Sequence, residues 1–588
     1  MKGILPWADY SAHHHLRRFR RRPHRWMRKP TLRRNAKRFW IGGGEAEPAQ
    51  LRHRIVAFFN RNPAPLRENR FWGNSDMDRE VHEQIVARYR RAKARRGPWE
   101  NLWRQCYEYA LPLRDVAPTG SLPNAKVADR LFDATAADAV DQLAASLVAQ
   151  LTPPWSRWFG LAGGGDLSED ERSAVGEPLE NIATALQANF DRSNFNVEIH
   201  QAFLDLVTVG TASLLFEEAA PGEPSAFRFT AVPLSQVAFE ERTDGRLDTT
   251  FRRTELTTAE LRARFPKAQF TQDEARDSGS DTETRHTIIE AVTPTETGGY
   301  QYSAVIENDD GSSVLDAPLS TGRFARSPFI NFRWLKAPGE VYGRSPVMKS
   351  LPDIKTANKV VELILKNATI AVSGIWQADD DGVLNPATVK LVPGTIIPKA
   401  VGSKGLTPLE APGRFDVSQL VLNDLRGRIR HALLADRLAP PDSPRMTATE
   451  VLERSAEVSR ILGATYGRLQ SELLNPVVER GIAILRRRGE IDDIVVDGRS
   501  IEIQYLSPLA QNQKRQDAQG VLLWLEAVSA FGPEALGILD VPKTARWIAR
   551  AFNLPESLIH PEDASEPGLP PLPMGREAIE GQIPGKVL

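Results

Sequence analysis

The stretch from Trp334 to Gly374 constrains the fold more than any other part of the chain. It reads as an extended segment, then the turn Tyr342-Gly343-Arg344-Ser345-Pro346, then one long amphipathic helix. Pro352 falls where the first turn of a helix tolerates proline, and Ser373-Gly374 supplies a stop. The apolar residues that recur at helical spacing are Ile354, Ala357, Val361, Ile364, Leu365 and Ala368. The stretch holds no nucleophile, metal ligand or phosphate loop, so it indicates a part of an assembly rather than an active site.

Six further motifs follow one another along the chain. They are Trp99–Trp103 (WENLW), Tyr109–Pro112 (YALP), Phe132–Ala136 (FDATA), Leu151–Pro154 with Trp158-Phe159, Arg445–Val451 (RMTATEV) and Tyr505–Ala510 (YLSPLA). With these motifs in this order, the chain from about residue 77 to residue 555 resembles the head-to-tail connector, or portal, proteins of short-tailed double-stranded-DNA phages. The positions taken as family motif residues are Tyr342, Gly343, Arg344, Ser345, Pro346, Thr447, Thr449 and Glu450.

The resemblance implies a mainly helical α+β fold with wing, stem, clip and crown parts, assembled as a ring around a central channel. The corresponding division of the chain is a basic leader at 1–76, a wing at 77–335 (helices, then a β-rich part), stem helix 1 at 336–374, a clip at 375–414, stem helix 2 at 415–436, a tunnel loop at 437–446, a long kinked helix with the return to the wing at 447–504, a crown at 505–560 and a tail at 561–588.

The function implied by the resemblance is mechanical. Such a ring, expected to be a dodecamer, sits at one capsid vertex of the virion, lets genomic DNA in and out, and carries the tail. The implied partners are double-stranded DNA, the terminase large subunit, the major capsid and scaffolding proteins and a tail adaptor, with assembly in the bacterial cytoplasm of a phage or prophage host. The alternatives are a tail adaptor, an internal core protein, or a DNA-processing enzyme; an enzyme would need a metal-binding carboxylate cluster or a phosphate loop, and neither is evident.

Composition sets looser bounds. At 588 residues the chain is longer than one hydrophobic core usually supports, so two or more domains are expected. Its single cysteine, Cys106, excludes a disulfide framework. No run of 18 or more apolar residues occurs, so the sequence predicts no membrane span. No cofactor, metal or catalytic residue is predicted.

Charge is distributed unevenly along the chain. Residues 1–40 hold 13 of the 75 Lys+Arg and one of the 75 Asp+Glu, which leaves 62 bases and 74 acids, a net charge of −12, in the remainder. The basic leader, with His13–His15 and Arg20–Arg22, is compatible with a nucleic-acid-binding arm. It is also compatible with dispensable sequence upstream of a start at Met77.

Periodicity predicts helices over 78–113, 129–151 and 178–218, and short strands over 227–332. Further strands are expected at 389–392 and 395–397. A second amphipathic helix is expected over 416–436, with Asp416 as its N-cap. Its predicted apolar face is Val417, Val421, Leu425, Ile429 and Leu433.

A proline-rich segment follows that helix. Pro440, Pro441 and Pro444 cannot continue it, and Thr447–Glu450 is a capping box that restarts a helix running to about Arg488, kinked at Pro476 and capped by Gly489. In the family the loop between these helices projects into the channel. The DNA-channel residues implied by the resemblance are Arg437, Pro440, Pro441, Asp442, Ser443, Pro444, Arg445 and Met446.

Other candidate sites have simpler explanations. Gln377–Gly382 resembles part of a calcium loop, but Thr388 stands where an EF-hand requires glutamate. Gly402–Gly405 lacks the spacing of a phosphate loop. Cys106 is expected to be a buried small apolar residue, and Gly343 to supply a backbone turn.

Overall fold

The chain divides into two compact units, Met1–Ala64 and Pro65–Leu588. The computed structural model describes parts of the second unit only. The described residues are 75–112, 130–266, 268, 285–296, 298–307, 318–373, 376–378, 401–402, 406–408, 415–438, 463, 465–491, 501–529 and 540–551. Predictions for the leader 1–76 before Ser75, for 389–392 and 395–397, for 439–462 and for the tail lie outside them.

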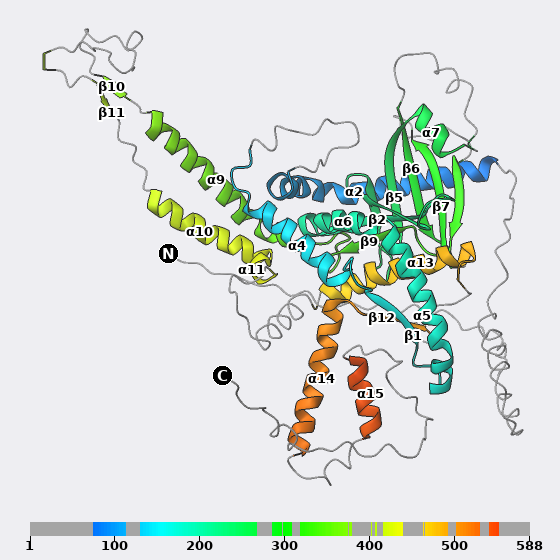
Figure 1. Ribbon diagram of the computed structural model, residues 1–588. Coiled ribbons are helices and arrows are strands. Elements are labelled where there is room, and N and C mark those ends of the chain that lie inside the picture. Colours follow the sequence, from blue (N-terminus) through cyan, green and yellow to red (C-terminus); the bar gives the residue numbers. More distant parts are fainter. Residues whose placement is uncertain are drawn as a thin grey trace, which may run out of the picture. The chain divides into compact units, whose positions relative to one another are not determined.

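Helices and antiparallel strands are both abundant, which makes the fold α+β (Figure 1). The helices described here are α2 (Ser75–Ala110), α4 (Thr135–Leu151), α5 (Glu169–Arg192), α6 (Phe195–Val209), α7 (Thr258–Arg264), α9 (Pro346–Ser373), α10 (Phe415–Ala432), α11 (Ala435–Leu438), α13 (Asn475–Arg488), α14 (Pro508–Ser529) and α15 (Val541–Ala551). Local chemistry sets several ends: Ser168 and Glu171 form a capping box at α5, and left-handed glycines Gly210 and Gly489 end α6 and α13.

The prediction of short strands over residues 227–332 is confirmed. One antiparallel sheet has the strand order β4 (Val237–Glu240), β5 (Thr249–Thr257), β6 (Arg285–Pro294), β7 (Tyr300–Glu307), β8 (Ser320–Phe324). A second has the order β3 (Phe227–Val232), β2 (Thr211–Glu218), β9 (Phe329–Arg333). Two small pairs join β1 (Phe159–Gly163) to β12 (Ile501–Tyr505) and β10 (Trp376–Ala378) to β11 (Leu406–Pro408).

Sequence reasoning placed 178–218 entirely in helix, and this was wrong for its last part. Gly210 has φ 78° and ends α6, and β2 begins at Thr211, pairing with both β3 and β9. The apolar run through Leu214 is therefore a central strand of a sheet, where both faces are buried. The helix expected at 129–151 begins later, at Thr135.

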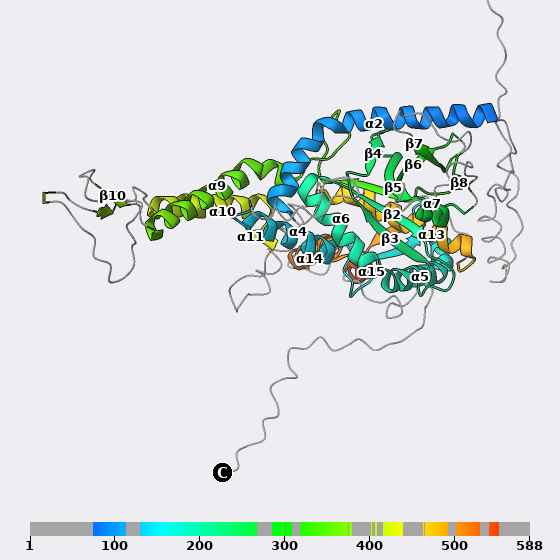
Figure 2. The same ribbon diagram turned by 90° about the horizontal axis from the view of Figure 1, so that it is seen from above.

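Two apolar layers fix the arrangement of these elements. Aromatic rings from α5, α6, β2 and β3 surround Phe190, whose ring centroid lies 5.0 Å from that of Phe227 and 5.2 Å from that of Phe195. On the five-stranded sheet, α2 packs through Ile85, Val86, Tyr89 and Ala92 against Phe251 and its neighbours (Figure 2). The helix therefore has a buried face and an opposite face exposed to solvent.

Helices α9 and α10 lie side by side (Figures 1 and 2). Arg428 of α10 bonds to Asp353 of α9 at 2.9 Å. The predicted details of both helices needed correction. Helix α9 begins at Pro346, so Pro346 and not Pro352 occupies its first turn, and α10 begins at Phe415, so Asp416 is already inside the helix and cannot be the N-cap.

The buried face of α10 is Leu422, Leu425 and Ile429, with Leu433 buried just after the helix, whereas Val421 is exposed. Helix α10 also ends before Asp436. Leu434 has φ 60°, which a non-glycine residue rarely adopts, and it breaks the helix before the prolines are reached. The chain then forms the short helix α11, which contains Arg437.

The helix predicted to run to Arg488 is described from residue 465 onward. Just before Pro476, Gln470–Leu474 form a π-helical turn, in which the Asn475 N–H donates to the Gln470 carbonyl five residues earlier. Pro476 follows in the first turn of α13. The wider turn accommodates the proline, because Pro476 has no N–H for the carbonyl four residues before it.

Candidate functional site

The Tyr342–Pro346 motif lies at a junction of four elements. It leads from β9 into α9 and packs against the residues where α6 passes into β2. The Gly343 N–H donates to Thr211 Oγ1 at 2.8 Å, and the Arg344 N–H donates to the Leu335 carbonyl at 2.7 Å. The motif therefore fixes the start of α9 on the sheet.

Gly343 and Gly210 meet main chain to main chain. A Cβ on Gly343 would lie 2.1 Å from the Gly210 carbonyl oxygen, and a Cβ on Gly210 would lie 2.6 Å from the Arg344 carbonyl carbon. The Gly210 carbonyl in turn accepts from the Trp334 N–H at 3.0 Å. The prediction that Gly343 serves a backbone turn was wrong in its reason: its φ is not in the left-handed region, and close approach is what requires glycine there.

Ser345 caps α9. Its hydroxyl accepts from the Met348 N–H at 2.9 Å and donates to the Thr208 carbonyl at 2.8 Å. This satisfies one of the free N–H groups of the first helical turn and ties the helix to the end of α6. Pro346 follows as the first helical residue, where its missing N–H has no partner to lose.

Tyr342 joins this motif to the Trp99–Trp103 motif. Its ring is fully buried, 5.0 Å from Trp103 and 6.1 Å from Trp99 between centroids. Burial raises the pKa of Tyr342, so its hydroxyl stays protonated. Arg344 lies over Trp99 and bonds to Glu340 at 2.8 Å, which lowers the pKa of that carboxyl.

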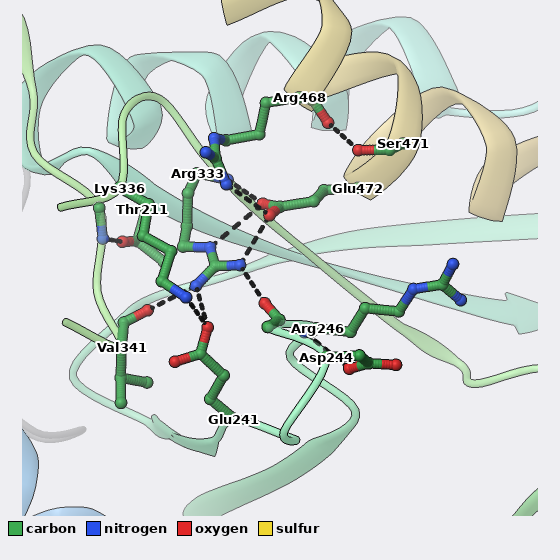
Figure 3. A network of polar contacts seen from close by, with 12 residues as sticks. Thr211, Glu241, Asp244, Arg246, Arg333, Lys336, Val341, Arg468, Ser471 and Glu472 are labelled. Carbon is green, nitrogen blue, oxygen red and sulfur yellow. Dashed lines mark hydrogen bonds and ion pairs between the residues drawn. The ribbon is translucent and has the colours of Figure 1, made fainter. Parts of the chain in front are cut away.

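Beside this junction, Arg333 forms the centre of a polar network (Figure 3). Its side chain is fully buried at the end of β9. It donates to Glu472 Oε1 at 2.7 Å, to Glu241 Oε1 at 3.3 Å and to the Gly245 carbonyl at 2.8 Å. Lys336 also pairs with Glu241, and Arg468 donates to Glu472 at 3.1 Å. The network holds the π-helical turn, the β4–β5 connection and the end of β9 together.

The Phe132–Ala136 motif is held by both side-by-side helices. Asn358 of α9 accepts from the N–H groups of Phe132 (2.7 Å) and Asp133 (3.1 Å). Arg426 of α10 donates to Asp133 Oδ2 at 2.8 Å. Burial works to raise the pKa of Asp133, but hydrogen bonds from Thr135 and Arg426 outweigh it and hold that pKa below its usual value.

Two more motifs meet at the small β1–β12 pair. Phe159 pairs with Tyr505, and the Leu506 N–H donates to the Trp158 carbonyl at 2.9 Å. Ser507 is buried, and Pro508 begins α14. Motifs that lie far apart in the sequence thus contact one another and hold separate elements of the fold together. We call these contact regions joints.

Of the residues predicted to line the DNA channel, only Arg437 lies among the described residues. Arg437 lies in α11, whereas Pro440, Pro441, Asp442, Ser443, Pro444, Arg445 and Met446, with the motif positions Thr447, Thr449 and Glu450, lie outside the described residues. Gln377 is in β10, and the rest of the calcium-like loop lies outside as well.

Side chains that could bind a metal ion are scattered among the described residues. None of their His, Cys, Asp and Glu side chains gather in a set that could hold a metal ion. Cys106 is buried, as predicted, and burial raises its pKa to about 12. Within the described ranges no helix is both long and apolar enough to cross a membrane.

Most of the chain matches proteins of bacteriophages. Residues 82–559 match a family model described as "Bacteriophage head to tail connecting protein". The chain is 26% identical over 508 residues, 81% of this chain and 88% of the relative, to a Bordetella phage BPP-1 protein named "Probable portal protein". It is 22% identical over 508 residues (82% and 89%) to the portal protein of Salmonella phage epsilon15, and 22% identical over 422 residues (69% and 75%) to that of Escherichia phage T7.

Proposed function

The chain belongs to the bacteriophage head to tail connecting protein family, and on that basis we propose that it is a portal protein. As such it forms the ring at one capsid vertex through which genomic DNA is packaged and ejected, and to which the tail attaches. The observation that carries this proposal is the family match across residues 82–559, together with relatives named portal proteins that align over most of both chains.

Exposed apolar side chains on the paired helices support ring assembly. Leu363 and Leu365 of α9 are each 49% exposed, and Leu420 and Val421 of α10 are 73% and 46% exposed. Large apolar side chains left exposed on the stem helices of an isolated subunit indicate surface that partners cover. A ring of identical subunits, here a dodecamer, covers the same side chains in every copy.

The parts of the ring follow the division set out above. We assign α9 and α10 to the stem (336–374 and 415–436), the residues between them (375–414) to the clip, residues 77–335 to the wing and 505–560 to the crown. Residues 437–446 are the tunnel loop, and 447–504 return the chain to the wing. The Tyr342–Pro346 junction and the Arg333 network are then joints between stem and wing.

The mechanism is transport rather than catalysis. The terminase large subunit drives DNA inward, and the ring guides it and releases it later by the same route. The net charge of −12 on residues 41–588 suits this role, because a channel rich in Lys and Arg would bind phosphates tightly, whereas acidic walls repel the duplex and let it slide. The other partners are the major capsid and scaffolding proteins and a tail adaptor, and the site of action is the virion.

Electron microscopy of the purified protein tests this proposal. Negative-stain images should show rings with a central hole. A monomer or an open filament would favour a tail adaptor or internal core protein instead. An ATPase assay on the isolated protein should give only background, since a rate that depends on the protein would indicate a processing enzyme.

The tunnel-loop assignment has its own test. Deletion of Pro440–Pro444 should leave rings intact but lower the amount of DNA packaged per particle. A deletion of the same length in the polar stretch ARDSG at residues 275–279 is the matched control, and particles with this deletion should package the normal amount of DNA. Loss of the ring would make 437–446 a packing element, and normal filling would make it a linker.

A further inference from the structure

The second half of helix α14 is apolar on nearly every side. Residues 521–528 read VLLWLEAV, in which Glu526 carries the one charge. A helix that is apolar all round is expected to be enclosed by neighbours. In one subunit α14 packs on α4 and α15 (Figure 1), yet Leu522, Leu523 and Trp524 are exposed, Leu523 by 67%. Within the described part of one subunit, this half of α14 therefore leaves apolar surface open to solvent.

The exposed side chains of α14 form one continuous surface. Successive residues of an α-helix are about 100° apart, so Leu522 and Trp524 lie on either side of Leu523. Glu526 is also exposed and lies about 60° from Leu523, between it and Leu522. The half-buried Leu525 lies about 160° from Leu523, on the opposite side of the helix. We call Leu522, Leu523, Trp524 and Glu526 the α14 arc.

Helix α15 carries a stripe of different chemistry. Its 11 residues hold three bases, Lys543, Arg546 and Arg550, and no acid. Lys543, Arg546 and Trp547 are spaced by three and four residues, so they share one side of the helix. Lys543 and Trp547 are exposed, and Arg546 is half-buried. Lys543 also lies 3.5 Å from Asp540, in an exposed pair of the kind that contributes little. We call Lys543, Arg546 and Trp547 the α15 stripe.

The α14 arc and the α15 stripe are complementary in charge and polarity. Residues 517–528 of α14 hold two acids, Asp517 and Glu526, and no base, whereas α15 holds bases only. Lysine and arginine have apolar stems that can cover Leu523 while their charged ends reach a carboxylate. A guanidinium also binds the face of an indole such as that of Trp524. The stripe therefore offers the contacts that the arc can accept.

The two surfaces belong to neighbouring helices of one subunit. The exposure of Leu523 shows that the stripe does not cover the arc within that subunit. Two different and complementary surfaces on one chain make a heterologous contact, in which the arc of one copy meets the stripe of the next. Such contacts repeat head to tail and close into a ring when the rotation between copies allows it. A second copy of this chain is therefore the partner that fits.

We propose that the α14 arc of each copy docks on the α15 stripe of the next copy, so that these helices form a closed layer of the assembly. The proposal rests on the proposed function, which supplies the ring. Trp524 and Trp547 are the aromatic anchors of the contact, since a few buried residues, often tryptophans, carry most of the binding energy of an interface. Glu526 and Lys543 pair across the boundary between copies.

Cysteine crosslinking tests which surfaces meet. Cys106 is buried, so a short bismaleimide reacts selectively with cysteines introduced at exposed positions. Chains with Leu523→Cys, co-expressed with chains that carry Lys543→Cys, should give a covalent dimer on a denaturing gel. A chain with both substitutions should give a ladder of higher multimers. The control pair of Leu523→Cys with Thr321→Cys, which is exposed on β8, should stay monomeric.

Two crosslinking results overturn the proposal. If the co-expressed chains give no dimer, the arc does not meet the stripe of a second copy and faces another protein or another part of its own chain. If the doubly substituted chain is linked only within itself, the arc is covered by α15 of the same copy.

The stability of the assembly gives a second test. Trp524→Ala should raise the protein concentration at which half of the rings dissociate by at least about tenfold, because truncation of an anchor costs this much or more. Trp155→Ala removes a still more exposed indole on the turn after α4 and is the matched control, expected to leave that concentration unchanged. Circular dichroism checks that both variants fold. Equal shifts in the two variants overturn the proposal.

An exchange of charges distinguishes a contact between copies from a local effect on α14. Glu526→Lys should weaken the ring, because it sets a cation against the stripe of the next copy. Adding Lys543→Glu to the same chain should restore the ring, since the pair then has its charges reversed. A double variant no more stable than Glu526→Lys alone overturns the pairing of these two residues.

Light scattering on the parent protein separates this proposal from the one on which it rests. If the parent forms rings and the cysteine pair does not link copies, only the contact between α14 and α15 fails. If the parent forms no ring, the portal function fails, and crosslinking of the co-expressed chains still decides whether the arc and the stripe meet.

Discussion

The contact between Gly210 and Gly343 should make the exchange of one hydrogen for a methyl group unusually costly. In Gly343→Ala the new Cβ would lie 2.1 Å from the Gly210 carbonyl oxygen and 3.0 Å from Arg333 Cβ. Neither neighbour is the free end of a side chain, so two main-chain segments must separate. Overpacking of this kind costs about 1–3 kcal/mol.

Separation also weakens the hydrogen bonds that close the junction. These are Gly343 to Thr211 (2.8 Å), Trp334 to Gly210 (3.0 Å) and Arg344 to Leu335 (2.7 Å). Each is worth about 1 kcal/mol net. The expected total loss is therefore about 4–6 kcal/mol, a large part of the roughly 5–15 kcal/mol that stabilises a typical protein.

Urea unfolding followed by far-UV circular dichroism measures this loss. Gly427→Ala in α10 is the matched control, because no atom lies within 4 Å of the added Cβ and the helix should gain up to about 1 kcal/mol. Gly339→Ala, with φ 81° and open space around it, isolates the backbone cost and should lose about 1 kcal/mol. A Gly343→Ala protein no less stable than Gly339→Ala would refute the reasoning from close approach.

Three further predictions concern other joints. Arg333→Met should lower the free energy of unfolding in urea by about 3–5 kcal/mol, because it leaves the carboxylates of Glu241 and Glu472 without their buried partner. Arg242→Met removes an exposed ion pair and should cost at most about 1 kcal/mol. Equal losses in the two variants would contradict the importance of the network. The pKa of Asp133 is lower in the folded protein, so its contribution to stability is present above the unfolded pKa of about 3.9 and is lost as pH falls through the lower folded pKa. Asp133→Asn should therefore reduce the loss of unfolding free energy between neutral and acidic pH. An unchanged pH dependence would count against the hydrogen bonds from Thr135 and Arg426. Cys106 is buried and its pKa is raised to about 12, so it should not react with a thiol reagent at about pH 8 in the folded protein and should react once urea unfolds it. Rapid labelling of the native protein would show that the Cys106 thiol is accessible to solvent.

The sequence predicted elements whose cause is local. Helix α9 follows from its apolar periodicity, and Gly489 caps α13 as expected. The sequence did not predict details that depend on a partner. Leu422 is buried in place of Val421 because contact with a neighbouring helix selects between adjacent apolar residues. The start of α9 was misplaced because the Ser345 cap gains its second bond from Thr208, far back in the chain.

The residues that form the joints stand out in the sequence as motifs, but the contacts that require those residues do not. Nothing local shows that Gly343 faces Gly210, or that an arginine ending a strand, Arg333, is fully buried. Its partner Glu472 is 139 residues away in the sequence. Such residues can be recognised only when the contacts that neutralise the charge are known.

The π-helical turn at Gln470–Leu474 has a consequence for how this helix tolerates changes in length. The turn contains one residue more than an α-helical turn would, and its wider winding absorbs that residue, so the segments before and after it keep nearly the phase of a continuous α-helix. Deleting one residue within the turn would therefore restore plain α-helix and leave the flanking side chains facing their present partners. Deleting one residue from the regular part of α13 would instead turn one side of the helix by about 100° relative to the other and draw it in by about 1.5 Å. A change in length that the regular helix cannot accept without repacking can thus be accepted at Gln470–Leu474.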